Sequence, residues 1–377
     1  MTSDLIGLEG VPPRRPAVPA GADLDLLALT GEPATSTHAV ADGADAVLTW
    51  DYAKGARPAL ARLYERAKAS MWNAETDLAW DTEVDQERLV LAGPGPEASL
   101  LNGTADVAGT ALASWGEAEW LQFGIESQNW TLSQFLHGEQ GALVCTAKLV
   151  ASAPWLDAKY FAATQVMDEA RHVEVFSRYL DTKLSGHYPV NAHLKALLDD
   201  VIADSRWDLT YLGMQIMVEG LALAAFGFIA QLTTEPLLAQ ILRRVMADEA
   251  RHVAFGVLSL RDLYRELSAA ELRERQEFAY EAAVRMRDRF LQQEVWERMG
   301  VDPREAIPLV MASPERQLFV TMLFSRIVPS CRRIGLLDAS GGWLRERFGE
   351  LGVLGFEHLP DDADQAAAYA VADGVSA

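Results

Sequence analysis

The chain is poor in cysteine. Among its 377 residues there are only two, Cys145 and Cys331, which lie far apart without Cys-x-x-Cys spacing. This excludes a zinc ribbon or a rubredoxin-like iron site and makes a disulfide framework implausible. We therefore expect both cysteines to be buried thiols.

Positive charge is also scarce. The sequence has 33 Lys and Arg residues against 54 Asp and Glu residues, which gives a formal net charge of −21. A surface this acidic repels phosphate backbones and anionic lipid. We expect neither a nucleic-acid partner nor a membrane partner.

Long uninterrupted apolar runs are missing. The most apolar stretch, residues 214–232, contains Glu219, Gly220 and Gln231, which favours a core helix over a membrane span. Near the N-terminus, the arginine pair at 14–15 is not followed by the apolar stretch that a secretory or twin-arginine signal requires. These features predict a cytoplasmic protein.

Alternating β-branched runs are nearly absent, whereas apolar residues recur at the three- and four-residue spacing of a helix face. The sequence predicts an all-α fold, a four-helix bundle with additional N- and C-terminal helices. Its expected segments are an extended or partly disordered arm (1–45), a helix and irregular connection (46–103), the four-helix core (104–267), accessory helices (268–340) and a solvated tail (341–377).

An internal repeat sets the expected architecture of the core. The hexapeptide Asp-Glu-Ala-Arg-His-Val occurs at 168–173 and again at 248–253, an offset of 80 residues, and the same offset pairs Glu139 with Glu219. In each half, a lone glutamate precedes a Glu-x-x-His by 30 residues, and Pro154 lies at the midpoint of the first interval. Each half is therefore predicted to be a helical hairpin.

This spacing predicts a metal site. Two equally long arms return the lone glutamate to the height of the Glu-x-x-His, whose i, i+3 spacing places carboxylate and imidazole on one helix face. Two facing hairpins supply four carboxylates and two imidazoles, which suits two iron or manganese ions. The predicted ligands are Glu139, Glu169, His172, Glu219, Glu249 and His252.

A single Glu-x-x-His is usually a solvated ion pair, so duplication and surroundings carry the prediction. Glu219 lies in an apolar stretch, where burying an unpaired carboxylate costs several kcal/mol or more. We further expect Asp168 and Asp248 to accept the second ring N–H of the histidine on the opposite hairpin. The alternative for both aspartates is an exposed helix charge. Arg171 and Arg251 are expected to pair with them.

These motifs, with Asp before each paired Glu, resemble the ferritin-like superfamily of non-haem di-iron carboxylate proteins over about residues 104–267. The resemblance implies a ferritin-like bundle with two iron ions, manganese or a mixed Mn/Fe pair being the alternative. It implies an O2-activating oxygenase or oxidase that hydroxylates, desaturates or N-oxygenates a small organic substrate. An external electron donor, such as a ferredoxin or reductase, is expected because the chain has no Gly-x-Gly-x-x-Gly in strand-to-helix context and no cysteine cluster. Residues 268–337 would suit either a pocket wall or the surface of a homodimer.

At three positions this sequence departs from the pattern of a particular group within the superfamily. Phe176 occupies the place of the tyrosine of radical-storing subunits, and Leu223 that of a threonine in multicomponent hydroxylases. Val245 stands where arylamine N-oxygenases carry a third histidine, which weakens the match to that group. The open alternatives are a dimanganese catalase, a Mn/Fe ligand-binding oxidase, and a non-enzymatic iron- or ligand-binding bundle.

Side chains one turn from the predicted ligands are mostly apolar, which suits either a dry substrate pocket or a plain core. The candidate pocket residues are Phe135, Leu143, Phe176, Gln215, Leu223 and Phe255.

Overall fold

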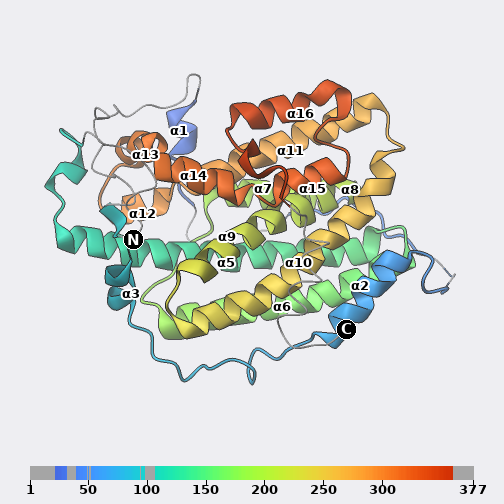
Figure 1. Ribbon diagram of the computed structural model, residues 1–377, viewed down its shortest axis with the longest axis horizontal. Helices are drawn as coiled ribbons and strands as arrows, with labels where there is room; N and C mark the ends of the chain where they lie inside the picture. Colours follow the sequence, from blue (N-terminus) through green and yellow to red (C-terminus); the bar gives the residue numbers. More distant parts are fainter. Residues whose placement is uncertain are drawn as a thin grey trace.

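The protein is described by a computed structural model over residues 22–31, 40–48, 50, 52–93, 95–97 and 107–359. All regular elements within these ranges are helices, and the predicted all-α class is confirmed (Figure 1). Most of the predicted N-terminal arm, and residues 360–377 of the predicted tail, lie outside the described residues.

Two helical hairpins form the core. The first joins α5 (Glu117–Ser152) to α6 (Leu156–Lys183) across Pro154. The second runs through α8 (Trp207–Tyr211), the π-helical segment η2 (Leu212–Val218) and α9 (Glu219–Leu232), then turns into α10 (Pro236–Tyr264). Glu235 caps α10 by accepting the backbone N–H groups of Leu237 and Leu238, and Pro236 occupies the first helical position.

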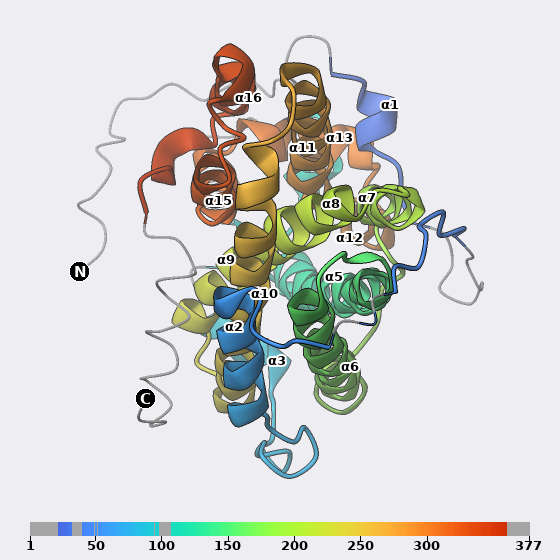
Figure 2. The ribbon, with the colours of Figure 1, turned by 90° about the vertical axis from the view of Figure 1, so that its right-hand side faces the viewer.

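The stretch Trp207–Leu232 is long and apolar enough to cross a membrane, but 78% of its most apolar window is buried inside the protein. The C-terminal helices lie on the same side of the molecule as this stretch (Figures 1 and 2). They are α11 (Ala269–Arg289), α15 (Ile327–Arg333) and α16 (Ala339–Glu350). A Cβ on Gly220 would lie 3.3 Å from Cγ1 of Ile327, so the glycine allows α15 to approach closely. The expectation of a core helix is confirmed.

The remaining helices surround this core. α2 (Pro58–Ala69) lies against α6 and α10, and α7 (Ala192–Ala203) lies against α5 and α11 (Figure 2). α12 (Gln293–Arg298), α13 (Pro303–Ala312) and α14 (Pro314–Leu323) complete the C-terminal part, followed by the short turn η3 (Leu354–Phe356). A 3-10 turn, η1 (Ala111–Ser114), precedes α5.

Helices also occur where the sequence predicted irregular chain. α1 (Leu24–Leu27) lies within the expected arm, and α3 (Gln86–Ala92) within the expected connection. Both begin at an aspartate that caps the helix, a local signal too short to stand out by periodicity. α16 extends past 340 into the expected tail because Leu344 and Phe348 are fully buried.

Candidate dimetal site

The six predicted ligands converge in the centre of the bundle. Each is at least 95% buried, and together they form two overlapping groups in which the potential ligand atoms lie within 4.8 Å of one another. The first group comprises Glu139 of α5, Glu169 and His172 of α6 and Glu249 of α10; the second comprises Glu169, Glu219 of α9 and His252 of α10.

The two imidazoles share the same carboxylates. His172 Nδ1 lies 3.4 Å from Oε2 of Glu169 and 3.2 Å from Oε1 of Glu249. His252 Nδ1 lies 3.1 Å from Oε1 of Glu169 and 3.4 Å from Oε1 of Glu249. By contrast, Glu139 lies 3.3 Å from His172 Nδ1 alone. Glu169 and Glu249 are thus central in the cluster, with Glu139 at its edge.

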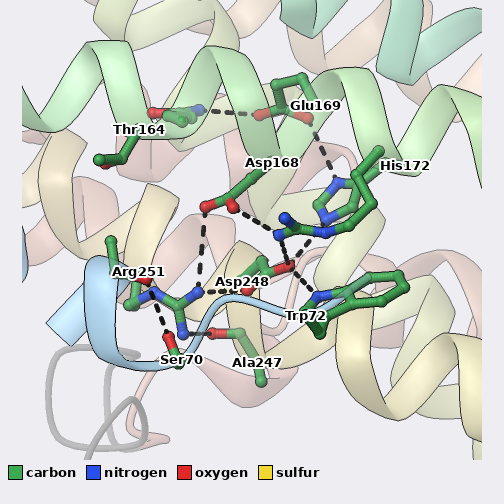
Figure 3. A network of polar contacts seen from close by, with 12 residues as sticks. Ser70, Trp72, Thr164, Asp168, Glu169, His172, Ala247, Asp248 and Arg251 are labelled. Carbon is green, nitrogen blue, oxygen red and sulfur yellow. Dashed lines mark hydrogen bonds and ion pairs between the residues drawn. The ribbon is translucent and has the colours of Figure 1, made fainter. Parts of the chain in front are cut away.

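Each histidine turns its other ring nitrogen toward an aspartate of the opposite hairpin. The Nε2 atom of His172 is 3.1 Å from Oδ2 of Asp248 (Figure 3). The Nε2 atom of His252 is 3.3 Å from Oδ2 of Asp168. With the Nε2–H donated to the aspartate, the lone pair of Nδ1 faces the glutamates. Both aspartates are buried, so neither is the exposed helix charge of the alternative interpretation.

Arginines and one tryptophan surround the aspartates. Arg171 Nη2 donates to Asp168 and, at 2.9 Å, to Asp248. Arg251 pairs with Asp248 (Figure 3). The indole N–H of Trp72 donates to Oδ2 of Asp248 at 2.8 Å, and the Arg171 guanidinium stacks on its ring. Trp72 was not predicted from the sequence, because nothing in its spacing connects the residues after α2 to the repeat.

Gln165 was also missed. Its side-chain N–H donates to Oε1 of Glu169 at 3.0 Å and to Oε1 of Glu219 at 2.7 Å, so it links the two hairpins. Gln165 lies one turn before Glu169, a position that the spacing alone could have identified. The 80-residue offset places Val245, not a second glutamine, at the equivalent position of α10.

Burial and mutual repulsion shape the titration of the cluster. Burial raises the pKa of Glu139 and of Glu219 well above the ordinary carboxyl range, and neighbouring carboxylates add to the effect. Burial opposes the charged imidazoles, yet the adjacent glutamates raise the pKa of His172 and of His252 well above the usual value. Burial also works against ionised Glu169, but the two histidines hold its pKa below the usual range.

The donor set fits bound cations. Within the described residues, Oε2 of Glu169, Oε2 of Glu219, both carboxylate oxygens of Glu249 and Nδ1 of His252 are buried without a hydrogen-bond partner. Buried acceptors left in this state are costly, and several converging on one point require positive charge. Two divalent ions would compensate the four carboxylates of the cluster.

The candidate pocket residues fall into two layers, one turn to either side of the ligands. Phe135, Phe176 and Leu223 form the layer toward the α9–α10 turn, and Leu143, Gln215 and Phe255 form the opposite layer. All are buried except Leu143, which is partly exposed. Both amide atoms of Gln215 lack a hydrogen-bond partner within the described chain. This leaves one polar group in otherwise apolar surroundings.

Comparison with known proteins places the chain in a family. The model of the family described as P-aminobenzoate N-oxygenase AurF matches residues 145–335, half of the chain. That range includes five of the six converging residues and omits Glu139. No curated protein matches.

Solved structures of an R2-like ligand-binding oxidase are also similar. One with an aerobically reconstituted Mn/Fe cofactor has 19% identity and a TM-score of 0.44, covering 84% of this chain and 100% of the oxidase. A variant with an anaerobically reconstituted Mn/Fe cofactor has 18% identity and a TM-score of 0.47, covering 76% of this chain and 96% of the oxidase.

The family match corrects one expectation. The absence of a third histidine at Val245 does not separate this chain from the arylamine N-oxygenase family. The expected superfamily, its oxygenase/oxidase branch and a cofactor of two metal ions are confirmed. The chain belongs to the P-aminobenzoate N-oxygenase AurF family and is an oxidoreductase of the ferritin-like dimetal class.

Proposed function

We propose that this chain oxygenates the nitrogen of an aromatic amine. The convergence of four buried glutamates and two histidines carries the proposal, together with the family to which the chain belongs. One oxygen atom of O2 forms the new N–O bond, giving a hydroxylamine, and the other leaves as water. Two electrons and two protons must enter, so we propose an external electron donor of the ferredoxin or reductase type in the cytoplasm.

We assign the six residues as the metal ligands. Glu169 and Glu249 lie close to both imidazoles and would contribute to holding both ions. Glu139 with His172 would complete one ion's shell, and Glu219 with His252 the other's. When bound, the ions supply the activation of O2. The donor set suits iron and manganese alike.

The surrounding side chains hold these ligands in place. Asp168 and Asp248 fix the ring orientation of the histidines, and Arg171 and Arg251 neutralise the aspartates. Gln165 holds Glu219 against Glu169. The apolar layers around the site exclude water from the reacting groups.

The proposal is tested by turnover with labelled oxygen. Protein loaded anaerobically with Fe(II) should convert 4-aminobenzamide or 4-aminobenzoate to the hydroxylamine with one atom from ¹⁸O2, given a chemical reductant. Glu219→Gln, folded by circular dichroism, should lose this activity, whereas Glu174→Gln, an exposed residue of α6, should retain it. Full metal loading without N-oxygenation would overturn the proposal, and rapid peroxide disproportionation by manganese-loaded protein would support the catalase alternative.

A further inference from the structure

A mainly apolar cavity lies at the end of the bundle where α9 turns into α10. Its volume is about 530 Å³, within the range that holds small organic ligands. Its walls come from α3, α5, α6, α9 and α10 and include Leu132, Tyr179, Ile229 and Leu238. Leu232, 64% exposed, marks its opening to solvent.

The cavity lies in line with the dimetal site along three helices. On α5 the order is Glu139, Phe135, Leu132; on α6 it is His172, Phe176, Tyr179; on α9 it is Glu219, Phe226, Ile229. From Glu139 to Leu132 is seven residues, or about 10 Å along the helix axis at ~1.5 Å per residue. In each helix, a phenylalanine separates the ligand from the cavity wall.

These three phenylalanines form one layer. The ring centroids of Phe135 and Phe226 are 4.7 Å apart, those of Phe176 and Phe226 5.7 Å, and those of Phe135 and Phe176 6.0 Å. All three are at least 97% buried. Their contacts are apolar, with no hydrogen bond or salt bridge to break when a ring rotates. A flat aromatic molecule matches the shape and polarity of such a layer.

The charge of the cavity lining bears on which substrates the cavity can accept. Of the side chains that line the cavity in the described part of the chain, none is charged; the polar ones are hydroxyls of Ser, Thr and Tyr and the amide of Gln128. Tyr179 donates its hydroxyl to the buried carboxylate of Glu235 at 2.8 Å, which adds negative charge behind the wall. A carboxylate entering here would lose its hydration and find no cation.

A second cavity, of about 560 Å³, does not fit this role. Its lining combines apolar side chains such as Met167 with three charged ones, Asp77, Arg171 and Glu174. The ion pairs of Arg171 with Asp168 and Asp248 close it off from the ligands.

We propose that this cavity, defined by Leu132, Tyr179, Ile229 and Leu238, admits substrate to the dimetal site through the layer of Phe135, Phe176 and Phe226, and that it selects an uncharged aromatic amine over an aminobenzoate anion. This inference rests on the proposed function only for the amino group of the substrate. The route and the charge selection rest on the cavity itself. The overall charge of −21 acts in the same direction by disfavouring the approach of anions.

The charge selection is tested by matched probes. 4-Aminobenzamide and 4-aminobenzoate have nearly the same shape and differ in charge, so the wild-type protein should bind the amide at least ten-fold more tightly in calorimetry. Ile229→Lys, a half-buried position in the wall, should raise the affinity for the anion ten-fold or more. Leu318→Lys, an exposed position on α14, makes the same charge change away from the cavity and should leave both affinities unchanged.

The route is tested by blocking it. Ile229→Trp should abolish binding of 4-aminobenzamide and lower kcat/KM at least ten-fold, without changing the metal content or the circular dichroism spectrum. Phe176→Leu should instead increase turnover of a bulkier aminonaphthalene relative to wild type. Equal affinity for both probes, or unchanged binding in Ile229→Trp, would overturn the cavity assignment even if arylamines are oxygenated. Binding that Ile229→Trp removes, without any turnover in the wild type, would overturn only the proposed function.

Discussion

The two hairpins of the core repeat the same ligand plan but support it differently. In the first, Glu139 lies on the continuous helix α5 and contacts the histidine of its own hairpin. In the second, Glu219 directly follows the π-helical segment η2 and accepts a hydrogen bond from Gln165 of the opposite hairpin. π-Helical segments occur frequently at functional sites.

The repeat itself differs one turn before each Glu-x-x-His. Gln165 occupies this position in α6, and Val245 occupies it in α10, where it is fully buried. The polar position thus lies beside Glu219, and the apolar one faces the core. The two halves of the repeat share the converging glutamates and histidines, whereas the contacts that support these residues differ, so the two halves of the site should respond unequally to equivalent substitutions.

The largest difference should separate central from edge ligands. Glu169→Gln removes a carboxylate that lies beside both histidines, so the metal content should fall from two ions per chain to less than one. Glu139 belongs to only one of the two groups of potential ligands, so Glu139→Gln should leave about one ion per chain. Elemental analysis of purified, reloaded protein measures both, with Glu174→Gln as control. Equal losses in the two variants would contradict the shared position of Glu169.

A smaller difference is expected between the two aspartates. Asp248 accepts hydrogen bonds from His172, Trp72 and both arginines, whereas Asp168 contacts His252 and chiefly Arg171. Asp248→Asn should weaken metal binding about 10- to 100-fold, the usual effect of losing such a partner, and Asp168→Asn should weaken it less. Competition with a chelator gives the affinities. A larger effect for Asp168→Asn would reverse the comparison.

Substitution of Gln165, at the position where the two halves of the repeat differ, should have a still smaller effect on metal binding. Gln165→Leu removes the hydrogen bonds to Glu169 and Glu219 and should lower the affinity for the second ion several-fold, because the net contribution of a typical hydrogen bond is about 1 kcal/mol. Val245→Leu, the equivalent change in the other hairpin, should leave both affinities unchanged. Stepwise metal titration distinguishes the two ions.

The smallest expected effect is the pH dependence of the metal-free protein. The pKa values of Glu139, Glu219, His172 and His252 are raised in the folded protein, so it binds more protons than the unfolded chain at neutral pH. The free energy of unfolding should therefore fall as pH rises above the unfolded values of 4.5 for Glu and 6.5 for His. Tm of chelator-treated protein should decrease from pH 6 to pH 9. Metal-saturated protein should not show this decrease, since binding deprotonates the histidines.

The convergence of the six side chains was predictable because a shared site constrains their spacing. Glu-x-x-His, the 80-residue offset and the equal 30-residue arms are visible in the sequence, and they suffice to bring together residues from four helices. The cross-hairpin contacts of Asp168 and Asp248 followed from the same geometry. Trp72 did not, because it reaches the site only through packing of α2 against the core.

The short helices and the cavity also could not be predicted from the sequence. α1 and α3 are one or two turns long and depend on an aspartate cap and on contacts distant in sequence. No periodic pattern in the sequence therefore predicts them. The cavity arises where five helices from different parts of the chain leave space between their side chains. The candidate pocket residues chosen by one-turn spacing instead mark the layers beside the ligands, and Phe226, seven residues after Glu219, was not among them.

The assignment of the six ligands is tested most directly by anaerobic titration with ⁵⁷Fe(II), followed by O2 exposure and Mössbauer spectroscopy. The arrangement of Glu139, Glu169, His172, Glu219, Glu249 and His252 predicts two iron ions per chain and, after oxidation, an antiferromagnetically coupled diferric spectrum. A single uncoupled iron site, or no stoichiometric binding in folded protein, would contradict it.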